Sequence, residues 1–136
     1  MLKKSITLSL SFILFSLLST GFTVDTKKID TDKLCKTWYI TSGVMKSGDY
    51  EEQLPEDIVN GKMIFYKNFT VKFIDPIDKD EVEKGTWKDL NGKLYIDIDD
   101  DPMTFEVKTL TNNKLIISSN KDGVYASMTL STSKKK

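Results

Sequence analysis

The sequence predicts an all-β fold, an antiparallel up-and-down barrel of eight strands with one short helix or lid after the first strand. Apolar and polar residues alternate repeatedly from residue 62 onward, which is typical of half-buried antiparallel strands. Asn91-Gly92 lies between two runs rich in aromatic and β-branched residues and fits a type I′ hairpin turn. The connections after residue 62 are short, so successive strands should be neighbours, and closure would remove the exposed edges. A two-layer sandwich satisfies the same alternation and stays the alternative.

Each expected strand is a β-forming run that ends at a turn signal. Trp38 should anchor the core from the first strand and Trp87 from the fourth. Gly85 should be small because the backbone or an aromatic ring approaches it closely. The predicted strands cover residues 34–43, 62–67, 69–75, 84–89, 93–98, 103–110, 114–119 and 124–132.

The segment after the first strand contains the predicted helix. Tyr50, Leu54, Ile58 and Val59 recur at helical spacing, and Pro55 limits the helix to a short one that begins near it. We therefore expect residues 48–60 to form a lid over one end of the barrel.

The chain ends are expected to lie outside the barrel. Lys3 and Lys4 precede an uncharged apolar run, and Ser19-Thr20-Gly21 places small residues where a signal peptidase cuts. Cleavage is preferred to a transmembrane anchor, because the run is barely long enough to span and is diluted by Ser, Thr and Gly. The protein should therefore be secreted, or periplasmic and envelope-associated, without a membrane anchor after processing. The predicted parts are a signal peptide at 1–21, a flexible lead-in at 22–33, the barrel at 34–132 and a basic tail at 133–136.

The charged residues exclude several functions. The 136-residue chain carries 20 basic and 20 acidic residues, no histidine, and only lysine among its basic residues. Without arginine, bidentate recognition of phosphate is missing, and without histidine the commonest acid-base catalyst is missing. The lysines are also spread along the chain, so we expect no nucleic-acid partner.

Cys35 is the only cysteine, so no disulfide within the chain is expected. Lys33-Leu34 precede it where a lipid-attachment site requires small residues, so lipid anchoring at Cys35 is not expected either. Packing as a small apolar side chain is the preferred interpretation. A nucleophilic role would need an activating histidine, which the chain lacks.

Two acidic stretches are candidates for metal ligation. Asp97, Asp99 and Asp101 alternate as in a calcium-binding loop, but Pro102 stands where the loop needs glycine and no glutamate closes it. The run from Asp75 to Glu83 is interpreted as a solvated loop that protects a strand edge. The sequence therefore predicts no metal site and no cofactor, and an enzyme would need convergent carboxylates that sequence alone cannot place.

An aromatic-rich inner face is the remaining candidate site. Eight-stranded barrels are just wide enough to hold one small ligand or to be filled by their own side chains, and both alternatives stay open here. The residues expected to line a ligand pocket are Trp38, Phe65, Phe69, Phe73, Trp87, Phe105 and Tyr125.

Four sequence stretches resemble the bacterial lipocalin-like domain family of small exported barrels, over about residues 34 to 132. They are Leu34-Cys35-Lys36-Thr37-Trp38, Lys62-Met63-Ile64-Phe65-Tyr66 with Phe69-Thr70-Val71, Gly85-Thr86-Trp87, and Leu110-Thr111-Asn112-Asn113-Lys114-Leu115. The resemblance implies an eight-stranded barrel in which Trp38 packs at the closed end. Lys36 stands where glycine is usual, and the arginine that typically covers this tryptophan has no counterpart.

The leader, the meander and the resemblance together predict a monomeric, non-enzymatic protein that binds a small hydrophobic or amphipathic ligand. The alternative is a filled barrel that serves as a protein or glycan interaction module at the cell envelope.

Overall fold

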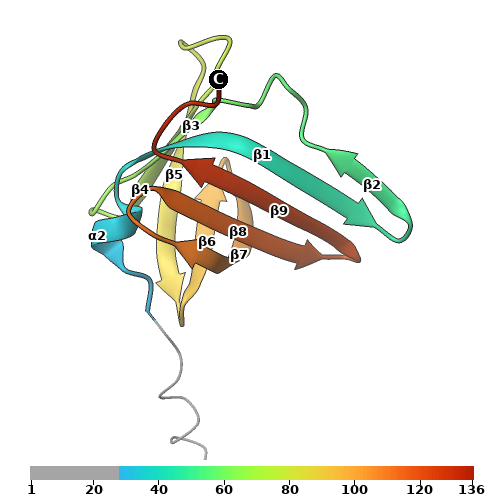
Figure 1. Ribbon diagram of the computed structural model, residues 1–136. Coiled ribbons are helices and arrows are strands. Elements are labelled where there is room, and N and C mark those ends of the chain that lie inside the picture. Colours follow the sequence, from blue (N-terminus) through green and yellow to red (C-terminus); the bar gives the residue numbers. More distant parts are fainter. Residues whose placement is uncertain (1–27) are drawn as a thin grey trace, which may run out of the picture.

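The computed structural model describes residues 28–136, and Figure 1 shows their arrangement. The predicted signal peptide and residues 22–27 of the predicted lead-in lie outside this range. Within it, no helix is long and apolar enough to cross a membrane.

One antiparallel sheet of nine strands closes on itself through the pairing of β1 with β9. Its strand order is β2-β1-β3-β4-β5-β6-β7-β8-β9, so each strand from β3 onward pairs with the next one in sequence. The elements are α2 (Thr31–Leu34), β1 (Thr37–Ser47), β2 (Tyr50–Gln53), β3 (Lys62–Phe65), β4 (Thr70–Ile74), β5 (Val82–Leu90), β6 (Lys93–Ile98), β7 (Asp101–Leu110), β8 (Lys114–Lys121) and β9 (Val124–Ser131).

The predicted fold class is confirmed, and closure decides for the barrel over the sandwich. The eight predicted strands correspond to β1 and β3–β9. The predicted hairpin turn is also present, because Asn91 and Gly92 have φ angles of 54° and 90°.

β1 has two different partners along one of its edges. Its first residues pair with β3, and its last four, from Val44 to Ser47, pair with β2. Its other edge pairs with β9 along nearly its whole length, with a bulge between Ile40 and Ser42. β1, β2, β9 and the end of β8, which pairs with β9 as far as Lys121 and Val124, therefore extend together beyond the remaining wall of the barrel (Figure 1).

The predicted helix over 48–60 is wrong, because β2 and a series of turns occupy this segment. The exposed edge of β1 supplies backbone partners, whereas a short helix here would have to overcome a costly nucleation. Leu54 and Ile58 nevertheless pack against the core, and the side chain of Leu54 occupies the space beside Gly43. The apolar spacing thus marked a segment that runs along the edge of β1 between β2 and β3, with hydrogen bonds from Leu54 N to Gly43 O and from Asn60 N to Ile40 O.

The short helix of this fold lies before the first strand. α2 begins after Asp30, whose Oδ1 accepts hydrogen bonds from the backbone N–H groups of Asp32 and Lys33. Ile29 is already buried at 8% exposure. Ordered structure therefore begins before Leu34, and the predicted flexible lead-in is corrected for residues 29–33.

The core is formed by inward-facing residues of all the barrel strands. Trp38, Leu94, Leu115 and Leu130 have no exposed surface. Gly85 is small for the predicted reason, because an added Cβ would collide with the carbonyl oxygen of Asp97 and lie 2.9 Å from Ile98 Cγ1.

Candidate binding cup at the open end of the barrel

The up-and-down topology places alternate turns at opposite ends of the barrel. The turns β3–β4, β5–β6 and β7–β8 lie at the end that carries α2, which we call the closed end. The connections β4–β5, β6–β7 and β8–β9 lie at the other end, which we call the open end.

Polar contacts fasten α2 and its flanking residues to the β3–β4 and β7–β8 turns and to the end of β5. Lys67 Nζ lies 2.9 Å from Asp32 Oδ1, and Asp89 Oδ2 accepts a hydrogen bond from Ile29 N at 2.7 Å. Lys36 Nζ donates to the carbonyl oxygen of Asn112 at 3.0 Å. The closed end is therefore plugged.

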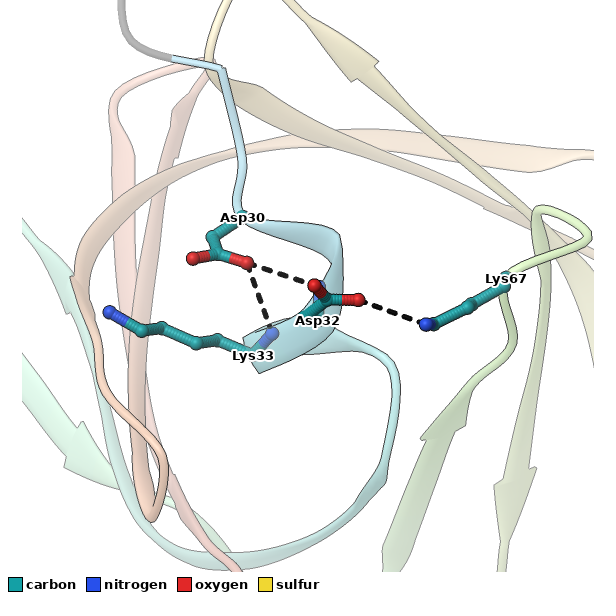
Figure 2. Close-up of polar contacts among 4 residues, drawn as sticks. All are labelled: Asp30, Asp32, Lys33 and Lys67. Carbon is teal, nitrogen blue, oxygen red and sulfur yellow. Dashed lines mark hydrogen bonds and ion pairs between the residues drawn. The ribbon is translucent and has the colours of Figure 1, made fainter.

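Figure 2 shows how Asp30 and Lys67 hold α2 from two sides. The hydrogen bond and the charge of Lys67 lower the pKa of Asp32, and Asp32 raises the pKa of Lys67 in the same way. Both side chains are largely exposed, so this ion pair orients the plug more than it stabilises it.

Aromatic side chains fill the barrel next to the plug. Trp38 donates from Nε1 to the carbonyl oxygen of Leu34 at 2.8 Å, and Trp87 donates to that of Tyr66 at 2.9 Å. Phe65 contacts the Trp87 ring edge-on, with 6.1 Å between ring centroids. The ammonium group of Lys36 lies 5.6 Å from the Trp38 ring centroid, so a lysine supplies the cation beside this tryptophan.

The seven predicted pocket residues do not share one cavity. Trp38, Phe65 and Trp87 are at most 2% exposed, and they form this filled layer. Phe69 is 52% exposed in the β3–β4 turn and packs on Trp87, with 5.0 Å between ring centroids.

The other three predicted residues lie elsewhere along the barrel. Phe73 packs against the backbone of Gly61. Tyr125 lies on the face of β9 opposite Leu130 and lines a polar groove on the outer wall. Phe105 alone of the seven lines the cavity of the open end.

That cavity has a volume of about 300 Å³, and we call it the cup. Its lining residues come from β3 and β5–β9, and most are apolar residues at inward positions of these strands. They are Met63, Glu83, Ile96, Ile98, Asp99, Asp101, Met103, Phe105, Ile117 and Met128.

Sequence reasoning missed most of this lining because it selected aromatic residues. The alternation itself contained the signal, since Met103 and Met128 stand on the same strand faces as Phe105 and Leu130. Methionine side chains are flexible and polarisable, and they suit a surface that adapts to different apolar shapes. No residue from 48–60 lines the cup, so that segment does not act as its lid in this structure.

The titratable groups of the described residues show few close clusters. Among residues 28–136, no group of three or more Asp, Glu, Cys or His side chains is arranged to hold a metal ion. Partial burial raises the pKa of the Cys35 thiol, which keeps it protonated and a poor nucleophile. Asp75 accepts hydrogen bonds from the backbone N–H groups of Asp78 and Ile77, which lower its pKa and order the β4–β5 loop.

A closed antiparallel meander with one plugged end and an apolar cup at the other defines the class of small up-and-down β-barrels. The model of the lipocalin-like domain family matches residues 34–117, more than half of the chain. The protein therefore belongs to the lipocalin-like domain family.

Solved bacterial structures share this fold. A lipocalin-like protein from Bacteroides uniformis ATCC 8492 aligns with a TM-score of 0.51 and 15% identity, covering 71% of this chain and 96% of that one. An uncharacterized protein from Bacteroides eggerthii DSM 20697 aligns with a TM-score of 0.50 and 14% identity, covering 71% and 98%. Comparison with curated proteins gave no match.

Proposed function

We propose that this protein is an exported, non-enzymatic binding protein that holds one small hydrophobic or amphipathic molecule in the cup. The observation that carries the proposal is the apolar cavity of about 300 Å³ at the open end. This volume is at the lower end of the range for small-molecule sites, which are concave, mostly apolar and largely preformed.

The filled closed end supports the same proposal. Plugging one end of the barrel gives a ligand a single route of entry and leaves the binding surface rigid on its inner side. A preformed cavity lowers the cost of ordering side chains on binding. The proposal also includes removal of residues 1–21, which the predicted export signal supports, and a monomeric mature protein.

Binding is tested by blocking the cup. In Met103→Trp the larger side chain should occupy the cavity, and Met45→Trp is a matched control because Met45 is 45% exposed and does not line it. We expect an environment-sensitive fluorescent hydrophobe to bind the wild-type protein and Met45→Trp alike. Met103→Trp should weaken binding by about tenfold or more, a change of about 1.4 kcal/mol.

The full-length chain, expressed in a bacterium and examined by native mass spectrometry, tests the remaining parts. A mass lacking residues 1–21, in a single-chain species, supports export and the monomer. Absence of hydrophobe binding, or equal binding by the wild-type protein and Met103→Trp, contradicts binding in the cup. A captured protein partner with no bound hydrophobe would instead favour an interaction module.

A further inference from the structure

The lining of the cup contains two kinds of side chain only. Seven of its ten residues are apolar and three are acidic, with no basic and no neutral polar side chain among them. Three other cavities of the protein each include at least one lysine in their lining. The cup thus differs from these three cavities in having no basic residue in its lining.

The strand register places the three carboxylates around the end of β6. Asp101 of β7 pairs with Ile98, the last residue of β6, and Asp99 lies in the turn between the two strands. On the other side of β6, Ile98 pairs with Gly85, and Glu83 lies two residues before Gly85 on the same face of β5. Glu83 and Asp101 therefore flank Ile98 at the rim.

Within residues 28–136, no lysine forms an ion pair with any of these three carboxylates. The ion pairs within residues 28–136 join Lys67 to Asp32 and Lys108 to Glu106, and neither pair involves the cup. All three rim residues are exposed to solvent, so their charges cost little to maintain. Their negative potential acts at the mouth of an apolar cavity, where low-dielectric walls focus it.

A ligand that complements this cup has an apolar body and a positively charged end. An ammonium group at the rim would form charge-assisted hydrogen bonds with the carboxylates, while its chain or ring contacts the methionines and Phe105. An anionic amphiphile would meet repulsion at the same place. The rim residues are not arranged as a metal site, which favours an organic cation over a metal ion.

We propose that the cup selects cationic amphiphiles, small molecules with one apolar body and one ammonium group, through Glu83, Asp99 and Asp101. This inference rests on the proposed binding function and adds the charge class of the ligand. Because exposed carboxylates act through a screened potential, the preference should weaken as the salt concentration rises.

Three ligands with one chain length separate charge from apolar contact: octylammonium, octanol and octanoate. We expect titration calorimetry at low salt to give octylammonium an affinity about tenfold or more above that of octanoate, with octanol between them. In the double variant Glu83→Gln/Asp101→Asn the three affinities should converge. The control Glu56→Gln/Asp57→Asn removes the same charge outside the cup and should keep the wild-type order.

The outcomes distinguish this inference from the proposal on which it rests. Equal affinities for the three ligands, or a preference that survives Glu83→Gln/Asp101→Asn, overturn the charge selection and leave binding in the cup intact. Failure of all three ligands and of the fluorescent hydrophobe to bind overturns both. A thermal unfolding curve for each variant separates loss of binding from loss of fold.

Discussion

The two ends of the barrel are built from the same alternating strands and yet serve different purposes. At the closed end, Trp38, Trp87 and Phe65 fill the interior and α2 covers it. At the open end, Met103 and Met128 line a cavity. Large rigid rings stabilise one end by burial, and smaller flexible side chains leave room at the other, so the stabilising core and the proposed binding site are separated along the barrel axis.

The largest expected effect is the loss of an aromatic ring from the closed end. Trp38→Ala removes a fully buried side chain and should lower the free energy of unfolding by about 3–5 kcal/mol. Met103→Ala at the open end should cost less than about 2 kcal/mol, because Met103 is partly exposed and already adjoins a cavity. Urea unfolding measures both.

If Trp38→Ala fails to fold, Trp38→Phe keeps most of the ring and removes the hydrogen bond to Leu34. A cost of about 1–3 kcal/mol is then expected, because the smaller ring leaves unfilled volume and the Leu34 carbonyl oxygen keeps only the backbone N–H of Lys36 as a donor. Equal costs for Trp38→Ala and Met103→Ala would contradict the division between the two ends.

A smaller effect is expected where the plug is fastened. Asp89 accepts hydrogen bonds from Ile29 N and from Gly92 N, both at 2.7 Å. Asp89→Asn keeps only one carbonyl oxygen and should destabilise the protein by about 1–3 kcal/mol, as measured by urea unfolding. Asp100→Asn in the exposed β6–β7 turn is the matched control, with an expected change within about 0.5 kcal/mol. A change of equal size in both variants would show that the plug is not held through Asp89.

The smallest effect concerns the exposed pair of Asp32 and Lys67. Lys67 lowers the pKa of Asp32 in the folded protein. The pair therefore contributes fully to the stability of the fold above the ordinary pKa of an aspartate, and this contribution to stability is lost as the pH falls through the lowered pKa. Lys67→Gln should return the pKa of Asp32 toward its ordinary value, as followed by carboxyl carbon shifts in an NMR titration. Lys108→Gln, which breaks the other exposed pair, should leave Asp32 unchanged. An unchanged Asp32 pKa in Lys67→Gln would mean that the pair does not form in solution.

Local patterns predicted the wall of the barrel and missed its plug. The alternation around Met103, Phe105 and Val107 was sufficient to predict β7, because its period of two does not depend on distant residues. α2 has only four residues and no periodicity, and Asp89, to which Ile29 N donates, lies 60 positions further along the chain. β2 was missed for a related reason, since the strand with which it pairs among residues 28–136 is the end of β1.

The sequence by itself determined the all-β class, the barrel strands and the Asn91-Gly92 turn, because side-chain alternation and positive φ angles are local properties. Only the tertiary structure decided how deep each inward residue lies. Depth depends on the stagger of all the strands around the closed barrel, which is a non-local property. That stagger buried Trp38 and Trp87 at the plugged end and left Met103, Glu83 and Asp101 around the cup.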